Sequence, residues 1–254
     1  MTQRRTIVLM PTFDEREALP ITVDRLLAAV PDVTLLIIDD ASPDGTGAVA
    51  DAMAAADQRV RVLHRASKDG LGAAYVAGMR IALDEGFERI VEMDADGSHP
   101  ASALPAMLEA SEGAELVIGS RWVAGGGIVD WPMRRQLISR AGTAYAQLAL
   151  GIRVADMTAG YRVYDADLLR RILDDRIVSR GYCFQIDMTR RSSDLGARIV
   201  EVPIVFRERE HGTSKITRGI VWEALVRTTG WGLGRRWRQL RGALAPLRRT
   251  RIAR

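Results

Sequence analysis

Short apolar runs alternate with segments of helical spacing through the first half of the chain. The runs cover residues 6–10, 34–38, 61–63, 89–93 and 115–118, and each is typical of a buried parallel strand. Between them, apolar residues recur every three or four positions, which predicts helices at residues 15–30, 46–56, 71–85 and 100–111. This alternation with short loops predicts an α/β fold in which helices flank a mostly parallel sheet.

The second half of the chain is less regular. Helical spacing predicts helices at residues 133–150, 165–173, 184–195 and 216–238, while the polar, glycine-containing residues 152–164 are assigned to no element. Apolar residues on both sides of Pro203 predict one late strand across residues 199–206. The last helix carries Trp222, Trp231 and Trp237 among apolar residues, so we expect a C-terminal amphipathic helix.

Length and composition allow one domain with an appendage. The chain has 254 residues, 47% of them hydrophobic, which is enough for a sizeable core. It has no stretch of about 18 uncharged apolar residues, so we expect no transmembrane helix. The run at residues 6–10 is too short for a signal peptide, and the single Cys183 fits a reducing compartment. We therefore expect a cytoplasmic protein.

Charge is distributed unevenly. The net charge is +4, yet residues 235–254 contain eight arginines and no acidic residue, and residues 1–206 are close to neutral or slightly acidic. A basic tail on such a body predicts an anionic partner, either a membrane surface or nucleic acid. We accordingly divide the chain into residues 1–220 and a helix with an arginine-rich tail at residues 221–254.

Polar residues gather where the predicted strands end. They are Thr12 and Glu15 after the first strand, Asp39 and Asp40 after the second, Asp94 and Asp96 after the fourth, and Arg121 after the fifth. Ligands of parallel α/β sheets bind beyond the carboxyl ends of the strands. This edge is therefore the predicted functional site.

Asp94 and Asp96 form the most informative pair. Two carboxylates this close repel each other unless a cation or a proton intervenes. Mg²⁺ and Mn²⁺ prefer hard oxygen ligands and often bind a substrate diphosphate at the same time. Ser98 could add a hydroxyl to such a site. The alternative is a solvated acidic turn, because Asp and Gly are common in loops.

Two further groups of residues have the chemistry to bind a nucleotide and phosphates. Asp39 and Asp40 could accept hydrogen bonds from a nucleobase or a ribose, although the following residues 43–46 also read as an ordinary turn. Arg121, Arg135, Arg209 and Lys215 could bind phosphates, and the loop at residues 209–215 could close over a diphosphate. The alternative interpretation is that the arginines are ordinary surface residues and that the loop is a solvated basic loop without a ligand.

Five segments in order carry a family resemblance. They are residues 8–15 (VLMPTFDE), 37–46 (IIDDASPDGT), 93–100 (MDADGSHP), 118–121 (IGSR) and 211–215 (HGTSK). Over residues 6–220 the chain resembles the family 2 inverting glycosyltransferases of the Rossmann-like GT-A fold. Within them it is most similar to the polyprenol (dolichol) phosphate mannose synthases.

The resemblance implies a donor, an acceptor and a metal: GDP-mannose, polyprenyl phosphate, and Mg²⁺ or Mn²⁺. It implies that Asp94, Asp96 and Ser98 hold the metal, and that Asp94, Asp96, Arg121 and Arg135 act in catalysis. The implied substrate-binding residues are Pro11, Phe13, Glu15, Ile38, Asp39, Asp40, Ala95, Arg209 and Lys215 for the donor, and Asp156, Gln185 and Asp187 on the acceptor side. Family members often have Glu where Asp187 stands, and some have Gln where Ser98 stands.

A lipid acceptor also suggests where the protein works. Tryptophan favours the membrane interface and arginine favours anionic lipid, so we expect peripheral binding at the cytoplasmic face of a membrane, or docking to a membrane-embedded partner, and no nucleic-acid partner. The nearest alternative is a polyprenyl-phosphate glucosyltransferase of the same fold. An alternative of another class is a non-catalytic protein that binds membranes or nucleic acid through its tail. An oxidoreductase is disfavoured because no glycine fingerprint for a dinucleotide is present.

Overall fold

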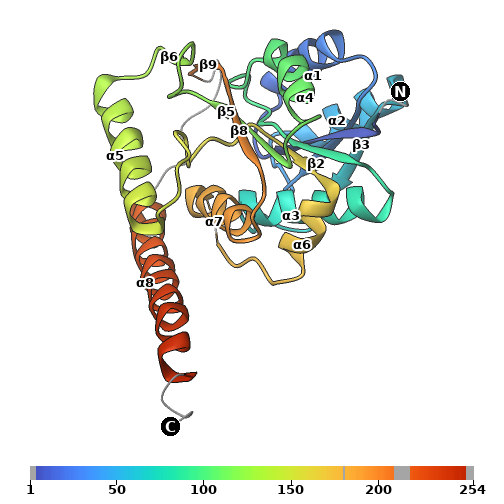
Figure 1. The fold of residues 1–254 in the computed structure, drawn as a ribbon. Helices are drawn as coiled ribbons and strands as arrows, with labels where there is room; N and C mark the ends of the chain where they lie inside the picture. The colour runs from blue at the N-terminus through green and yellow to red at the C-terminus, as the bar shows by residue number, and fades with distance from the viewer. Residues whose placement is uncertain (1–3, 180, 209–217, 250–254) are drawn as a thin grey trace.

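A seven-stranded sheet forms the centre of the protein and lies between two layers of helices (Figure 1). This computed structural model describes residues 4–179, 181–208 and 218–249. The strands follow the order β3-β2-β1-β4-β7-β5-β8. They are β1 (Thr6–Thr12), β2 (Thr34–Asp39), β3 (Val60–His64), β4 (Arg89–Glu92), β5 (Leu116–Ser120), β7 (Arg162–Asp165) and β8 (Ile199–Pro203). The predicted α/β fold with a mostly parallel sheet is confirmed.

Each face of the sheet is covered by its own set of helices. On one face lie α1 (Ala18–Ala29), α2 (Thr46–Ala56) and α4 (Leu104–Ala110), the last preceded by a 3₁₀ turn, η1 (Ala101–Ala103). On the other lie α3 (Leu71–Asp84), α6 (Ala166–Leu173) and α7 (Gly181–Asp194). Successive side chains of a strand point to opposite faces, so the apolar runs of the strands supply both cores.

One strand of the sheet was not predicted. β7 runs antiparallel between β4 and β5, within a region that looked too polar for a buried strand. Its first residue, Arg162, is fully buried but well bonded: it donates to the carbonyls of Met157 and Ala159 and to the hydroxyl of Tyr164. These local hydrogen bonds offset the free-energy cost of burying a guanidinium. The pattern of hydrophobic residues in the sequence gives no sign of such bonds.

The late strand is divided in two. β8 pairs with β5 as far as Pro203, whereas β9 (Val205–Arg207) pairs with β6 (Gly127–Val129) in a separate two-stranded sheet. Ile204 is the junction, because its amide donates to the carbonyl of Ser120 and its carbonyl accepts from Gly127. The prediction of a single strand across residues 199–206 was therefore wrong.

Two long helices stand beside the sheet. α5 (Met133–Leu150) packs against α8 (Arg218–Arg249), which also contacts α7 and whose last part extends away from the sheet (Figure 1). The approach is close: a Cβ atom on Gly232 would lie 2.4 Å from the carbonyl oxygen of Ala149. In addition, the Arg190 guanidinium lies 4.9 Å from the ring centre of Trp231. None of the helices in the described part of the chain combines the length and apolar character needed to cross a membrane.

Candidate active site

The carboxyl ends of β1, β2 and β4 meet at one edge of the sheet, and we call the residues that follow them the carboxylate side. Thr12 lies opposite Asp39 in the ladder, and the Asp40 amide donates to the Thr12 carbonyl over 3.1 Å. Asp39 is only 4% exposed and accepts from the hydroxyl of Thr12 at 3.1 Å and from the amide of Ser42 at 3.3 Å. Asp39 therefore fixes the turn that presents Asp40.

Asp40 is paired with a residue from the next strand end. Its carboxylate lies 2.5 Å from the Arg65 guanidinium. Burial raises the pKa of Asp40, and the charge and hydrogen bond of Arg65 oppose that effect in part. Close by in the sequence, Ile38 is fully buried, while Pro11, Phe13 and Glu15 are partly exposed. Pro11 lies opposite Ile38 in the β1–β2 ladder, and Phe13 and Glu15 come just after β1.

The ring of Phe13 is covered by a cation. The Lys68 ammonium lies 3.4 Å from the ring centre, a cation–π contact between the β1 and β3 ends. An aromatic face and two carboxylates at one corner form a surface with the chemistry to hold a nucleoside.

Asp94 and Asp96 stand in the turn after β4. Gly97 follows with φ +77°, a left-handed conformation that glycine adopts without strain. Asp96 is 7% exposed and accepts from the Ser98 amide at 3.0 Å. Asp94 accepts from the Tyr75 hydroxyl at 3.0 Å, and its own amide donates to Nδ1 of His99 at 3.0 Å. Both carboxylates are thus oriented by the protein.

The residues of this turn fit a hard divalent cation. Within the described residues no cluster of three or more His, Cys, Asp or Glu side chains could hold a metal ion. Mg²⁺ commonly binds through one or two carboxylates together with water and substrate phosphates, and this turn offers two carboxylates. The Ser98 hydroxyl is buried and has no hydrogen-bond partner within the described residues, which suits it to complete such a shell. Ala95, between the two aspartates, is 2% exposed and its carbonyl accepts from Thr22 on α1 at 2.9 Å.

The opposite part of the edge, which we call the arginine side, is built around Arg121 at the end of β5. Asp156 accepts from the Nε and Nη2 atoms of Arg121, both at 2.7 Å, and the Thr158 hydroxyl accepts from Nη2 at 2.8 Å. Burial acts to raise the pKa of Asp156, but the hydrogen bonds and charge of Arg121 outweigh it and leave that pKa below its usual value. Glu201 on β8 holds this loop by accepting from the amides of Ala155 and Asp156 at 2.7 and 2.9 Å.

The antiparallel direction of β7 explains how Asp156 reaches this edge. The start of an antiparallel strand lies beside the ends of its parallel neighbours. Residues 156–160, which lead into β7, therefore arrive next to the ends of β4 and β5. The direction of β7 explains why Asp156 lies at this edge, where it pairs with Arg121. Its part in binding the acceptor stays a prediction.

Aromatic rings surround Arg121. Its guanidinium carbon lies 5.6 Å from the ring centre of Trp131 and 5.5 Å from that of Phe206. The ring of His99 stacks on Tyr161, with centres 4.9 Å apart, and meets Phe206 edge-on. This cluster joins the turn that holds Asp94 and Asp96 to the arginine side.

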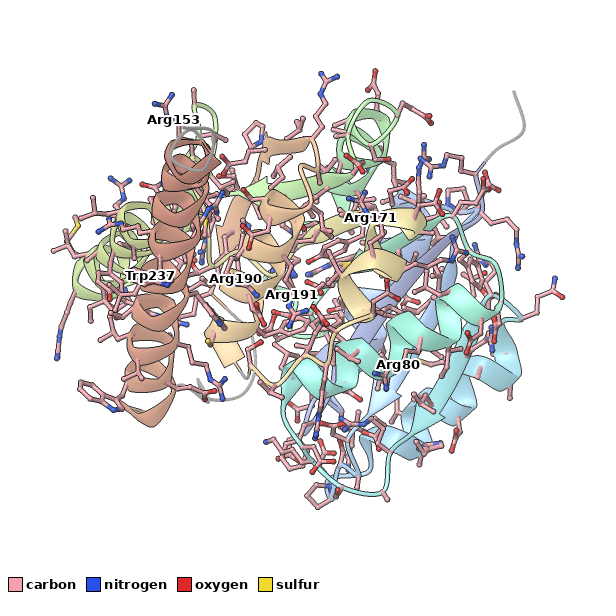
Figure 2. All side chains as sticks on the ribbon, turned by 60° about the horizontal axis from the view of Figure 1, so that its bottom comes forward. Arg80, Arg153, Arg171, Arg190, Arg191 and Trp237 are labelled. Atoms are coloured by element: carbon pink, nitrogen blue, oxygen red, sulfur yellow. The ribbon has the colours of Figure 1, made fainter. Side chains whose placement is uncertain are left out.

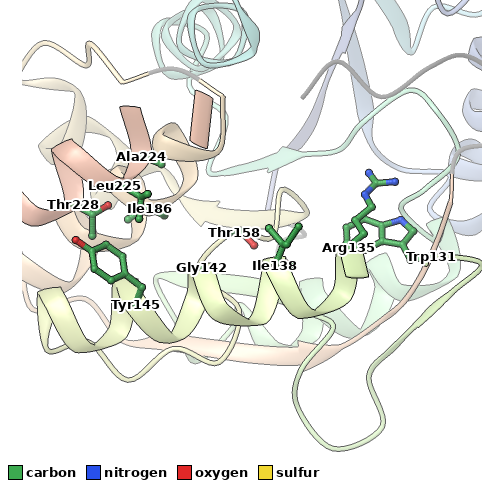
Figure 3. A pocket seen from close by; sticks show the side chains of 11 residues that line it. Trp131, Arg135, Ile138, Gly142, Tyr145, Thr158, Ile186, Ala224, Leu225 and Thr228 are labelled. Carbon is green, nitrogen blue, oxygen red and sulfur yellow. The ribbon is translucent and has the colours of Figure 1, made fainter. Parts of the chain in front are cut away.

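An apolar pocket of about 140 Å³ opens beside that cluster, between α5 and α8. Its lining residues are Trp131, Arg135, Ile138, Ser139, Gly142, Tyr145, Thr158, Ile186, Ala224, Leu225 and Thr228. Arg135 and Trp131 lie at one end and Tyr145 and Thr228 towards the other (Figure 3). The Arg135 guanidinium stacks 3.9 Å from the ring centre of Trp131 and pairs with Glu208 at 2.5 Å. The pocket thus has a guanidinium at one end and a mostly apolar lining.

Two predicted acceptor residues are buried in the core. Gln185 is 3% exposed and donates to Glu92 on β4 at 2.9 Å. Burial raises the pKa of Glu92 to about 7, with the charge of Arg162 opposing it. Asp187 is 2% exposed and accepts from Ser179 and Arg190 at 3.0 and 2.6 Å. Arg209 and Lys215 lie outside the described residues.

Several residues of the site gave no separate signal in the sequence. Tyr75, Trp131, Thr158 and Glu201 lie on four different elements or loops and come together only in the fold. Of these, Tyr75 follows the glycines of Gly70-Leu-Gly72. A Cβ on Gly72 would lie 2.8 Å from the Phe184 ring, so that glycine has a packing role.

Comparison with known proteins gives consistent findings. The sequence model described as glycosyl transferase family 2 matches residues 7–173. The chain is 56% identical over 240 residues to an undecaprenyl-phosphate mannosyltransferase of Micrococcus luteus, covering 94% of this chain and 99% of that protein. It is 48% identical over 243 residues to a polyprenol monophosphomannose synthase of Mycolicibacterium smegmatis, covering 95% and 92%.

A solved structure shares the fold. Glucosyl-3-phosphoglycerate synthase from Mycobacterium tuberculosis, in complex with Mn²⁺, UDP-glucose and phosphoglyceric acid, aligns with a TM-score of 0.67 at 20% identity, over 89% of this chain and 80% of that one.

Proposed function

Because the chain belongs to glycosyl transferase family 2, and is therefore a glycosyltransferase, we propose that it moves mannose from GDP-mannose to a polyprenyl phosphate with inversion. One observation carries the proposal: the oriented carboxylates of Asp94 and Asp96 share the carboxyl edge of the sheet with Arg121. A leaving diphosphate needs a cation, and an anionic acceptor needs positive charge nearby. Both requirements are met along one edge.

The chemical identity of the substrates comes from the relatives and the motifs. Two relatives that cover nearly the whole chain are named for mannosyl transfer to undecaprenyl phosphate and for polyprenol monophosphomannose synthesis. The donor GDP-mannose is what the family resemblance of the motifs around Asp40 and Asp94 implies. We place the nucleoside against Pro11, Phe13 and Asp40.

A divalent cation, Mg²⁺ or Mn²⁺, belongs to this proposal. Mn²⁺ is bound with UDP-glucose in the solved structure of like fold. In this chain Asp94, Asp96 and Ser98 would hold the ion, and it would supply Lewis-acid stabilisation of the departing diphosphate.

The acceptor needs little activation. A phosphate monoester is already anionic at neutral pH, so no general base has to remove a proton. A lone pair on a phosphate oxygen attacks the anomeric carbon, and the bond to the donor diphosphate breaks on the opposite side, so that the configuration inverts. The role left to the protein is to hold two anions in line and to exclude water.

Arg121 and Arg135 are suited to different parts of that task. Arg121 is held in a fixed orientation by Asp156 and Thr158, so it would act at this edge without reorganisation. Arg135 is half-buried at one end of the apolar pocket. We infer that Arg135 meets the acceptor phosphate, that the pocket takes the first part of the polyprenyl chain, and that Arg209 and Lys215 grip the donor.

The outer faces of α5 and α8 suit a membrane surface. Large apolar side chains are exposed on both helices, namely Met133, Leu137 and Leu148 on α5 and Trp222, Val226, Leu233 and Trp237 on α8. Arg153 lies near the same helices, and Trp237 is 59% exposed on α8 (Figure 2). Aromatic and basic residues together favour an anionic membrane interface. We place the enzyme on the cytoplasmic face, with residues 1–220 as catalytic domain and residues 221–254 as the contact to the membrane or to a membrane-embedded partner.

One experiment tests the proposal and its nearest alternative together. The purified protein is incubated with Mn²⁺, undecaprenyl phosphate and either GDP-mannose, UDP-glucose or UDP-N-acetylglucosamine. We expect lipid-linked product with GDP-mannose alone. Product with UDP-glucose alone would replace the proposal by a polyprenyl-phosphate glucosyltransferase, and no product with any donor would refute both.

A further inference from the structure

We propose that Tyr75 is a positioning residue that fixes the carboxylate of Asp94 for the cation. Its hydroxyl donates to Oδ1 of Asp94 over 3.0 Å, from the first half of α3. This inference rests on the metal site of the proposed function and assigns to it a residue from outside the strand-end motifs. Tyr75 would act through Asp94 and not by touching the substrate, because its side chain is fully buried.

The position of Tyr75 is set by unusually close packing of α3. A Cβ on Gly78 would lie 2.6 Å from Ile38 Cδ1, and one on Gly72 would lie 2.8 Å from the Phe184 ring. Side chains at these two sites would push the helix off the sheet and off α7. The two glycines therefore let α3 lie close enough for the Tyr75 hydroxyl to reach the end of β4.

Aromatic stacking fixes the ring plane as well. The rings of Tyr75 and Phe184 have centres 6.2 Å apart and planes within 5° of each other. A buried hydroxyl is expected to have a hydrogen-bond partner, and here that partner is a carboxylate at the candidate metal site. Phenylalanine would pack equally well at this position, so packing alone does not explain the hydroxyl.

A neutral donor suits this task better than a basic one. Arginine or lysine beside Asp94 would neutralise the carboxylate that a divalent cation requires. A tyrosine hydroxyl orients the same carboxylate and leaves its charge in place. The Asp94 amide is bonded to His99 at 3.0 Å, so the backbone and the side chain of this residue are fixed independently.

The test is Tyr75→Phe, which removes the hydroxyl alone. Mn²⁺ affinity is measured in the presence of GDP by electron paramagnetic resonance, without turnover. We expect it to fall by about 10- to 100-fold, the usual cost of losing a residue that orients a metal ligand. GDP affinity in EDTA should not change.

The matched control is Tyr164→Phe. Tyr164 is also fully buried, and its hydroxyl accepts from Arg162 at 3.3 Å. We expect this variant to keep wild-type Mn²⁺ affinity, with a similar midpoint of thermal unfolding in both variants. Unchanged affinity in Tyr75→Phe, or an equal loss in both variants, would overturn the inference. If wild-type protein bound no Mn²⁺, the metal assignment of the proposed function would fail with it.

Discussion

The carboxylate side and the arginine side of the site are built in different ways. On the carboxylate side, Asp39 ends β2 and Asp40 follows it, while Asp94 and Asp96 lie in the turn after β4. On the arginine side, Arg121 is held by Asp156, which precedes an antiparallel strand, and by Thr158, while Glu201 fixes the loop from a third strand. The carboxylates of the first arrangement stand in short sequence motifs. The second depends on contacts between segments 35 to 46 residues apart.

The difference suggests a division of labour. The carboxylate side carries its negative charge at a local turn and can take up a cation as soon as a diphosphate arrives. The arginine side carries a buried, preformed ion pair beside an apolar pocket. Substitutions on the carboxylate side should therefore mainly lower activity, and breaking the ion pair on the arginine side should mainly lower stability.

The largest expected effect is on the carboxylate side. Asp96→Asn should lower kcat/KM for mannosyl transfer by at least about 1000-fold, because Lewis-acid stabilisation of the leaving group is worth several kcal/mol. The midpoint of thermal unfolding should stay close to that of the wild type, since Asp96 lies in a turn. Steady-state kinetics and calorimetry measure the two quantities, and normal turnover would refute the metal assignment.

On the arginine side the expected effect is on stability. Asp156→Ala leaves the Arg121 guanidinium, 5% exposed, without its carboxylate. We expect the free energy of unfolding to fall by about 3–5 kcal/mol, as when one partner of a buried pair is removed. Urea denaturation measures it.

The control is Glu85→Ala, which breaks the pair with Arg61 at the surface, where the side chains are 40% and 35% exposed. A loss below about 1 kcal/mol is expected there. Equal losses of unfolding free energy in the two variants would show that the buried Arg121–Asp156 pair stabilises the fold no more than a surface pair does.

Filling the apolar pocket should act on the acceptor alone. Gly142 lines the pocket from α5, and a Cβ there would meet no atom within 4 Å. Gly142→Leu should raise KM for undecaprenyl phosphate about tenfold, because lost burial costs roughly 0.8 kcal/mol for each methylene-sized group. KM for GDP-mannose should stay the same.

Gly142→Ala serves as the matched variant for that experiment. Like Gly142→Leu, it replaces glycine by a residue of higher helix propensity, but it fills little of the pocket. A similar rise of the acceptor KM in both variants would contradict the assignment of the pocket to the lipid chain.

The smallest expected effect concerns the outer face of α8. Trp222 is 68% exposed, and Trp222→Ser should weaken binding to anionic vesicles by roughly three- to tenfold. Transfer to a short, detergent-soluble acceptor should be unaffected. Vesicle sedimentation measures the binding, and a transfer assay measures the activity. Unchanged vesicle binding would show that Trp222 is not part of the proposed membrane contact.

Sequence reasoning predicted the two sides unequally, for a physical reason. The order of parallel strands and the turn with Asp94 and Asp96 could be predicted, because strand length, hydrophobic runs and strand-end carboxylates are local signals. β7 could not, since its buried Arg162 looks like a surface residue until its three local partners are known.

The same limit applies to individual residues of the site. Gln185 and Asp187 are bonded to partners in the core that the sequence did not indicate, and their part on the acceptor side stays a prediction. Tyr75 was not predicted at all, because its partner Asp94 lies 19 positions away on another element.

The central claim is that Asp94 and Asp96 hold a cation against the diphosphate of the donor. The most direct measurement is a crystal structure of the protein with GDP-mannose and Mn²⁺, with the ion located by its anomalous scattering. We predict one Mn²⁺ peak bonded to a carboxylate oxygen of this pair and to the diphosphate. A nucleotide bound in that structure with its ion elsewhere, or with no ion beside these two residues, would contradict the account.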